Sequence, residues 1–435
     1  MNAYRENPIS FRIPAYSHTN TRFLPSVRWV RKTLIRNSRS CYNISLRITG
    51  ENMLFTREQH EAHESQVLAG YALHSRDSQG RKYPEPEAEF RTAFQRDRDR
   101  ILHTTAFRRL EYKTQVFVNY EGDYYRTRLT HTLEVAQIGR SLARALGVNE
   151  DLVETICLGH DLGHPPFGHA GEAILRKLMV DHGGFEHNKQ SYRILTELEQ
   201  RFPDWDGLNL THETREGIIK HETEYDKADV DDFSTDLRAS MEAQIANVAD
   251  ELAYNVHDLD DGLRAGLLHE SQLTDITLWK RITEEVGWKG PYLSEMDRHT
   301  IVRELIGLQV NDVIQHTGAQ IEQNNLQSPE DVQRLDRNIV GHSDEIQHLN
   351  REWKDFLYHN LYRHYRVVRM SVKAERFLTD LFNEYIRVPE QLKPNTRERV
   401  ERVGLYRVVC DYVAGMTDRY ALQEWERLFS PFVRP

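Results

Sequence analysis

The pattern in this chain that is most able to do chemistry joins a lone histidine, an adjacent histidine–aspartate pair and a distant aspartate. Its four members are His131, His160, Asp161 and Asp250. Imidazole and carboxylate ligands together suit a first-row divalent cation. Two histidines and two aspartates leave positions on such an ion open for water and a substrate oxygen, which is typical of a catalytic rather than a structural metal site. The sequence therefore predicts a catalytic metal centre.

Each part of this pattern is weak by itself. A lone histidine such as His131 is more often a satisfied core residue, and adjacent His-Asp pairs arise by chance in a chain with 21 histidines. The pattern gains weight from the loop that follows the pair, because Gly163, Pro165, Pro166 and Gly168 shape that loop. The combination, rather than any single residue, indicates function.

His169 and Glu172 come directly after that loop, three residues apart. Residues with this spacing at the start of a helix are neighbours, so the carboxylate can fix the tautomer of the imidazole and raise its basicity. Such a pair suits a general acid that must carry a proton near neutral pH. The alternative is a capping pair that only satisfies amides at the start of a helix. The adjacent metal pattern favours the catalytic interpretation.

Helical spacing places two further groups near the predicted centre. Asp250, Tyr254 and Asp258 fall on one face of a helix, so the first can reach a metal while the next two turns reach a bound ligand. Arg128 lies three residues before His131, so its guanidinium can face the same site. Most arginines are exposed surface charges. Among the candidate cations for binding a phosphate, only Arg128 is tied to the predicted centre by its spacing; the others are Arg108, Arg109, Lys113, Lys220 and His221.

The apolar pattern predicts helices almost everywhere after residue 87 to hold these residues. A stripe over 128–146 predicts a helix that Gly147 ends, and Asn149 can cap the next helix, which runs to about His160-Asp161. The remaining predicted elements are a helix from about residue 169, helical runs at 189–201, 212–221, 237–260, 297–325, 345–388 and 397–429, and a short hairpin at 115–126. The sequence therefore predicts an all-α fold.

The composition is that of an ordinary globular protein, with 39% apolar and 29% charged residues. No window approaches the roughly eighteen uninterrupted apolar residues of a membrane span. The three cysteines are odd in number and widely spaced, which excludes a disulfide framework and fits a reducing compartment. We therefore expect a cytoplasmic protein without a membrane segment.

Residues 1–52 differ from the rest of the chain. They carry nine Lys or Arg and two Glu, a charge of +7, and since the whole chain carries −10, the remainder carries −17. Three explanations stay open: an overextended start, with the true chain beginning at Met53, a transit peptide, or a basic nucleic-acid arm. In each case we expect no packed structure. The acidic remainder makes single-stranded nucleic acid a secondary partner at most.

Longer strings around the chemical residues resemble a known family. They look like the deoxyguanosinetriphosphate triphosphohydrolase-like branch of the HD-domain metal-dependent phosphohydrolases, and the likeness covers about residues 53–430. The strings span 107–117, 127–132, 160–172, 249–258 and 411–419. The boundaries that we expect are 53–435 for the all-α domain, about 126–262 for its HD core and about 297–430 for a C-terminal helical lobe.

The resemblance implies hydrolysis of a deoxynucleoside 5′-triphosphate, with dGTP the expected substrate, to the deoxynucleoside plus inorganic triphosphate. Water would attack the α-phosphorus, and His169, held by Glu172, would protonate the departing 5′-oxygen. The implied metal is Mg²⁺ or Mn²⁺, with iron as an alternative, and its implied ligands are His131, His160, Asp161 and Asp250. The implied substrate contacts are Gln115, Arg128, His164, His187, Tyr254 and Asp258. The family also implies a homo-oligomer.

Two other functions stay open at this point. The first is another HD phosphohydrolase, which would act on a nucleoside monophosphate, a cyclic nucleotide or a guanosine polyphosphate. Such enzymes share the metal set but lack the extension from His164 to Glu172 as it stands here. The second is a protein that binds nucleotides or single-stranded DNA without catalysis. The presence of every proposed metal ligand argues against this second function.

Overall fold

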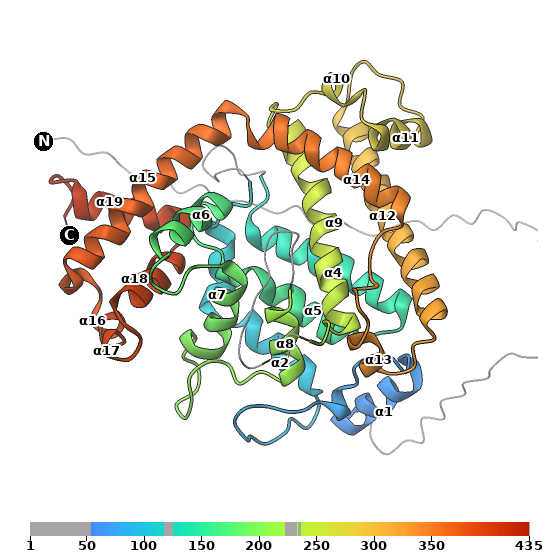
Figure 1. Cartoon of the computed structure of the whole chain (residues 1–435), viewed down its shortest axis with the longest axis horizontal. Coiled ribbons are helices and arrows are strands. Elements are labelled where there is room, and N and C mark those ends of the chain that lie inside the picture. The colour runs from blue at the N-terminus through green and yellow to red at the C-terminus, as the bar shows by residue number, and fades with distance from the viewer. Residues whose placement is uncertain (1–53, 117–124, 222–232, 234–235, 435) are drawn as a thin grey trace, which may run out of the picture. The chain divides into compact units, whose positions relative to one another are not determined.

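The computed structural model describes residues 54–116, 125–221, 233 and 236–434. Within these ranges the chain forms helices and turns without a β-strand, so the prediction of an all-α fold is confirmed (Figure 1). No helix in the same ranges is long and apolar enough to cross a membrane. The predicted leader at 1–52, and most of the hairpin predicted at 115–126, lie outside the described residues.

Three helices form the centre of the fold: α4 (Arg128–Leu146), α5 (Glu150–Gly159) and α9 (Met241–Arg264), which pack against one another (Figure 1). Gly147 ends α4 as predicted, with a left-handed φ of 69° that suits a residue without a Cβ. The Asn149 side chain accepts a backbone N–H from the first turn of α5 and so begins that helix, also as predicted.

The chain turns sharply after α5. A 3₁₀ turn, η4 (His160–Gly163), leads through the Pro-Pro loop to α6 (Gly168–Leu178), and α7 (His187–Arg193) packs back on η4. A Cβ on Gly163 would lie 2.1 Å from the His187 carbonyl oxygen, so this approach needs a glycine. The contact brings the histidine at the start of α7 next to the His-Asp turn.

Two further apolar clusters complete the described core. One joins the C-terminal half of α9 to α11, α12 and α14, and the other joins α6 to α15, α18 and α19. Their bounds are α11 (Thr277–Glu285), α12 (Glu295–Asn324), α14 (Asp344–Leu357), α15 (Tyr365–Arg387), α18 (Leu405–Ala414) and α19 (Asp418–Phe429). The C-terminal helices therefore pack directly on the helix that follows the His-Asp turn.

The remaining described elements have eleven residues or fewer. They are α1 (Arg57–Val67), η1 (Ser75–Asp77), α2 (Ala93–Leu102), α3 (Thr105–Arg109), η2 (Leu110–Tyr112), the π-helix η5 (Ile194–Leu198), α8 (His212–Ile219), α10 (Glu270–Leu273), α13 (Pro329–Gln333), the π-helix η6 (Tyr358–Tyr362), η7 (Pro389–Gln391), α16 (Pro394–Arg397) and α17 (Val400–Val403). Of these, α2 and α8 pack against α5, and η6 joins α14 to α15.

The prediction of two long, continuous helical runs near the C-terminus is wrong, because each run consists of several shorter helices. The run at 345–388 is divided because η6 interrupts it and the His364 side chain caps a new helix, α15. The run at 397–429 is divided into short helices by Gly404, at φ 84°, and by Thr417, which caps α19. The apolar spacing continues across these breaks, so periodicity alone did not reveal them.

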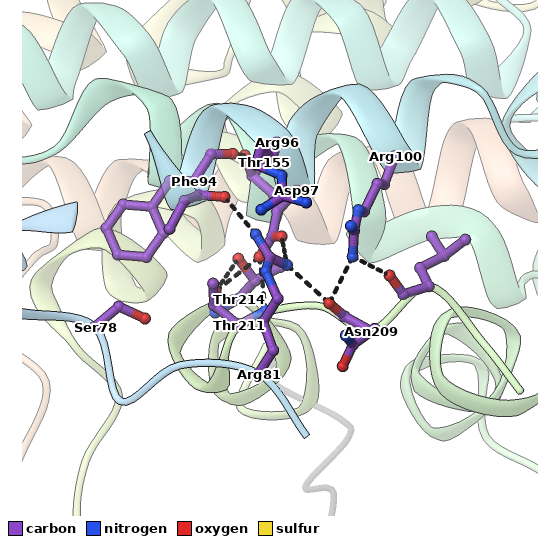
Figure 2. A network of polar contacts seen from close by, with 12 residues as sticks. Ser78, Arg81, Phe94, Arg96, Asp97, Arg100, Thr155, Asn209, Thr211 and Thr214 are labelled. Carbon is purple, nitrogen blue, oxygen red and sulfur yellow. Dashed lines mark hydrogen bonds and ion pairs between the residues drawn. The ribbon is translucent and has the colours of Figure 1, made fainter. Parts of the chain in front are cut away.

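A buried polar network fixes the segment before α2 (Figure 2). The Arg81 guanidinium pairs with Asp97 of α2 and donates to the carbonyl oxygens of Asn209 and Ala93, at 2.7 and 3.0 Å. Asp97 also accepts the backbone N–H and the hydroxyl of Thr211, at 2.8 and 2.7 Å. One fully buried carboxylate therefore joins three segments that are distant in sequence.

Replacing Asp97 with alanine would remove the carboxylate that pairs with Arg81 Nη1 and would leave Glu85, whose Oε1 atom lies 3.2 Å from Arg81 Nε, as the acidic partner of this buried cation. Breaking a buried ion pair by removing one partner costs about 3–5 kcal/mol, so we expect Asp97→Ala to lower the free energy of unfolding by that amount in chemical denaturation. The matched control is Asp99→Ala on the same helix, whose pair with Arg91 is partly exposed and should contribute about 1 kcal/mol or less. Equal losses for both variants would contradict this account of the network.

Candidate metal and phosphate site

Three of the predicted metal ligands converge from three helices. His131 of α4, His160 at the end of α5 and Asp250 of α9 place one ligand atom each within 4.8 Å of one another. The Oδ1 atom of Asp250 lies 2.9 Å from His131 Nε2 and 3.5 Å from His160 Nε2. The packing of the three central helices thus brings these side chains to one point.

Asp161 extends this group and joins it to a cation. Its Oδ1 atom lies 3.4 Å from His160 Nε2, and its Oδ2 atom accepts a 2.8 Å hydrogen bond from Arg128 Nη1. Nitrogen and oxygen ligands about 2.0–2.2 Å from a metal ion lie about 3 Å from each other. The spacings among His131, His160 and Asp250 therefore approach those of an ion's coordination sphere, whereas Asp161 lies close to His160 but outside the group whose ligand atoms are all within 4.8 Å of one another.

The orientation of His160 also fits a metal ligand. Its Nδ1 atom lies 2.6 Å from the Cys157 carbonyl oxygen, which fixes the ring and directs Nε2 toward the two carboxylates. Within the described part of the chain, this buried Nε2 atom makes no hydrogen bond of good geometry. A neutral imidazole held in this way offers a lone pair to a cation, so the donor set fits a divalent ion.

The two carboxylates stay ionised although the protein surrounds them. Burial alone would raise the pKa of Asp161, but the Arg128 guanidinium and then His160 hold that pKa well below its usual range. Burial is likewise outweighed at Asp250, chiefly by His160, and its pKa is also well below the usual range. The same carboxylates overcome the effect of burial on His160 and raise the pKa of that imidazole to about 9. A metal ion bound here must therefore displace a proton.

Behind the predicted metal ligands lies a second layer of histidines, which the sequence analysis did not predict in this role. His257 Nδ1 lies 3.3 Å from His131 Nδ1, and His257 Nε2 lies 3.1 Å from a Glu134 carboxylate oxygen. His221 Nε2 lies 3.6 Å from the second oxygen of Asp250. His257 follows Asp250 by seven residues on α9, so helical spacing could have identified it.

A second group of histidines surrounds Glu172 of α6. The rings of His164 and His187 are stacked with their centroids 3.9 Å apart, and His164 Nε2 lies 3.2 Å from Asp161 Oδ1. His169 joins this group, with its ring centroid 5.4 Å from that of His164 and its side chain 62% exposed. The structure thus places these predicted residues beside the metal ligands.

Glu172 makes its closest contacts with His187 rather than with His169. Its carboxylate accepts the backbone N–H of His187 at 3.0 Å and lies 3.0 and 3.1 Å from His187 Nδ1, whereas His169 Nδ1 is 4.0 Å away. The carboxylate raises the pKa of His187 against the effect of burial. Desolvation and the nearby Arg128 cation lower the pKa of His169, and in the free protein they outweigh the effect of Glu172, which raises it.

Arg128 is a buried cation with spare hydrogen-bonding capacity. It is 1% exposed, and within the described residues its Nε and Nη2 atoms lack hydrogen-bond partners. A Cβ on Gly168 would lie 3.1 Å from Arg128 Nη2, so the backbone at the start of α6 comes close to the guanidinium. Unsatisfied buried donors are costly, and a bound anion would satisfy them.

The other predicted substrate residues border the same region. Gln115 is 7% exposed, and its Oε1 atom lacks a hydrogen-bond partner among the described residues. The Tyr254 ring lies 6.3 Å from that of His169 and is stacked on Tyr362, whose hydroxyl donates to Asp258. Burial raises the pKa of Asp258 to about 8. Tyr362 comes from η6, and no sequence pattern links it to α9.

The proton on His160 makes metal binding dependent on pH. Because the pKa of that imidazole is about 9, the apparent affinity for Mn²⁺ should rise by up to about tenfold per pH unit as the pH increases toward this value. Isothermal titration calorimetry in buffers of different ionisation enthalpy should show proton release on binding. A Mn²⁺ affinity that is independent of pH would contradict the assignment of His160 as a protonated ligand.

Two variants distinguish a predicted metal ligand, Asp250, from a residue that contacts a ligand from behind, His257. We expect Asp250→Ala to abolish the Mn²⁺-dependent rise in melting temperature, and His257→Ala to weaken Mn²⁺ binding about 10–100-fold, as for other outer partners of metal ligands. The control is His182→Ala, since that exposed histidine stacks on Tyr406 away from the predicted ligands. Unchanged Mn²⁺ stabilisation in Asp250→Ala would exclude this site.

Comparison with known proteins finds two matching family models. The HD-domain family model matches residues 128–255, which include all four predicted ligands, and the phosphohydrolase-associated domain matches 340–427. The chain also aligns with the crystal structure of a hypothetical protein from Aquifex aeolicus, at 18% identity over 77% of this chain and 71% of that one; the TM-score of 0.34 is too low to establish a common fold.

Relatives cover nearly the whole described chain. A deoxyguanosinetriphosphate triphosphohydrolase-like protein from Geobacter sulfurreducens is 51% identical over 370 residues, which are 84% of this chain and 96% of the relative. A protein of the same description from Deinococcus deserti is 49% identical over 382 residues, 87% of this chain and 98% of the relative. The chain therefore belongs to the deoxyguanosinetriphosphate triphosphohydrolase-like family of HD-domain phosphohydrolases.

Proposed function

We propose that this protein hydrolyses deoxynucleoside 5′-triphosphates, dGTP among them, to the deoxynucleoside and inorganic triphosphate. The observation that carries the proposal is the position of Asp161 between two groups. One of its oxygens faces the predicted metal ligand His160, and the other pairs with Arg128, whose remaining donors are free within the described residues. A metal ion on one side of Asp161 and the Arg128 guanidinium on the other could together bind a chain of phosphates at two points.

The proposed metal is Mg²⁺ or Mn²⁺, with iron as an alternative. Its proposed ligands are His131, His160, Asp161 and Asp250. When bound, such an ion supplies Lewis acidity, which lowers the pKa of water and withdraws charge from phosphoryl oxygens. The carboxylates and imidazoles come from packed helices, so they are held in place before the substrate arrives.

The phosphates would bind to Arg128 and to the stacked pair of histidines. The Nη2 atom of Arg128 is buried, lacks a hydrogen bond within the described residues and approaches the loop before α6. His164 Nδ1 is also buried without a hydrogen bond there. His187, whose pKa Glu172 raises, adds positive charge beside it. These groups would stabilise negative charge that develops on the phosphates as the α-phosphorus reacts.

His169 is the proposed general acid. Water attacks the α-phosphorus, its oxygen forms a new bond to phosphorus and releases a proton to solvent, and the bond from phosphorus to the 5′-oxygen breaks. His169 delivers a proton to that 5′-oxygen, so the products are a neutral 5′-hydroxyl and the triphosphate anion. The low pKa of His169 in the free protein should rise when the phosphates bind, because nearby negative charge favours the imidazolium.

The sugar would lie between Gln115 and the second half of α9. The free Oε1 atom of Gln115 can accept a hydrogen bond. Asp258, which is bonded to Tyr362 and has its pKa raised to about 8, can act as donor or acceptor near neutral pH. Tyr254 stacks on Tyr362 beside His169 and would contact the sugar from one side. We propose these four residues as the contacts to the deoxyribose.

Product analysis tests the proposed reaction. Purified protein with Mn²⁺ or Mg²⁺ should convert one or more dNTPs to deoxynucleoside and intact triphosphate, which anion-exchange chromatography resolves. The amounts formed from each dNTP would rank the bases. Deoxynucleoside monophosphate plus pyrophosphate, or no turnover, would contradict the proposal and would favour an HD phosphohydrolase with another nucleotide substrate.

The pH dependence of the rate tests the role of His169. Since kcat/KM reports the pKa of a group in the free enzyme and kcat that in the complex, the alkaline decline of kcat should lie at higher pH than that of kcat/KM. His169→Ala should lower kcat about 10²–10⁴-fold while Mn²⁺ binding is retained. His182→Ala, an exposed histidine outside the predicted site, should keep normal rates. Near-normal turnover in His169→Ala would refute this role.

A further inference from the structure

Asp418, the first residue of α19, is a buried carboxylate that binds backbone far from its own helix. Its Oδ2 atom accepts the backbone N–H of Thr114 at 2.9 Å and also the Thr114 hydroxyl, and its Oδ1 atom accepts the N–H of Phe167 at 2.9 Å. It is 3% exposed. Thr417 caps α19, so Asp418 is not needed for that purpose. Its three bonds instead join α19 to two loops.

Both loops lead directly into proposed substrate contacts. Thr114 precedes Gln115, and Phe167 precedes the residues that begin α6, including His169. A Cβ on Gly168 would lie 3.4 Å from the carbonyl oxygens of both Thr114 and Gln115, so the two loops lie against each other. A displacement of either loop would therefore move groups proposed to contact the substrate.

Lys113 makes a second connection from the same region. Its Nζ atom donates to the His164 carbonyl oxygen and, at 3.2 Å, to that of Ala414, the last residue of α18. Its own carbonyl oxygen accepts the backbone N–H of Arg128 at 3.2 Å. Lys113 is 2% exposed. One buried lysine thus links the end of α18, a proposed phosphate-binding histidine and the start of α4.

The loop before α6 has few backbone donors, although the Phe167 side chain is 5% exposed and lies in the apolar cluster that joins α6 to the C-terminal helices. Pro165 and Pro166 lack a backbone N–H, so His164 and Phe167 supply the only backbone donors between η4 and α6. Phe167 has a left-handed φ of 64° and gives α6 no side-chain cap. Such a conformation in a bulky residue costs energy and persists only where the surroundings hold it. The hydrogen bond from Phe167 to Asp418 is such a constraint.

We propose that the turn from Ala414 to Asp418 is a clamp that positions the substrate-binding loops, with Asp418 and Lys113 as its positioning residues. This proposal rests on the proposed function for the identity of the substrate contacts. The C-terminal helices would then determine the rate of hydrolysis without touching the substrate. Asp418 holds Thr114, next to Gln115, and Phe167, in the loop that leads to His169 on α6, and Lys113 holds the backbone of His164.

Two kinds of variant test the clamp. Asp418→Asn keeps the shape of the side chain but replaces one acceptor with a donor, so one of the bonded N–H groups loses its partner. Thr114→Val removes only the hydroxyl, and Thr114→Ser retains it. The matched control is Asp411→Asn in α18, a buried carboxylate that binds Arg193, Arg399 and Gln190 instead of the loops.

We expect Asp418→Asn and Thr114→Val to lower kcat about 10²-fold, the order of loss that a misplacement of about 1 Å produces. Affinity for Mn²⁺ should stay within about twofold, because the proposed ligands lie on α4, η4 and α9. Hydrogen exchange of the peptide 164–172, followed by mass spectrometry, should become faster in both variants. Thr114→Ser should restore both readouts, and Asp411→Asn should lower the melting temperature without changing kcat.

A fall in melting temperature with unchanged kcat and unchanged exchange of 164–172 would overturn the clamp and leave Asp418 a structural residue. An equal loss of kcat in Asp411→Asn would also overturn it. If Asp418→Asn does not fold, the pair Thr114→Val and Thr114→Ser decides the matter. If the wild type releases no triphosphate while exchange still rises in the variants, the proposed function fails and the clamp stands.

Discussion

The structure depends on keeping two aspartates ionised where three helices meet. Burial of a carboxylate is costly unless opposite charge and hydrogen bonds compensate for it. At Asp161 the compensation comes from Arg128 and His160, and at Asp250 it comes from His160 and His131. These partners lie on different helices, so the packing of α4, α5 and α9 and the neutralisation of the carboxylates require each other. The same arrangement leaves an attractive place for a divalent cation.

Buried carboxylates farther from the three central helices are also compensated by partners on other segments of the chain. Glu172 is compensated by His187 across α6 and α7, and Asp97 by Arg81 across α2 and the segment before it. Asp418 differs, because it is satisfied mainly by backbone and hydroxyl donors of the loops beside the site. The C-terminal helices also share an apolar cluster with α6. Helices that follow the residues matched by the HD-domain model therefore contact the loops beside the proposed site.

Features set by neighbouring residues, such as helix ends, could be predicted from the sequence. Side-chain partners that only the packing of distant helices brings together could not. The limits of α4 and the start of α5 follow from a glycine and an asparagine at their ends, and the metal pattern follows from residue types. Glu172 was assigned to His169 from helical spacing, but the approach of α7 gives its hydrogen bonds to His187. Tyr362 comes from a π-helix that no periodicity reveals. His257 could have been found, since it shares a face of α9 with Asp250.

The central claim is that water attacks the α-phosphorus of a deoxynucleoside triphosphate held between the metal ligands and Arg128. The most direct measurement is turnover in water labelled with heavy oxygen, followed by mass spectrometry of both products. The account predicts that the label enters the triphosphate and that the deoxynucleoside stays unlabelled, because the bond between phosphorus and the 5′-oxygen breaks. Label in the deoxynucleoside, or label in a monophosphate product, would contradict the account.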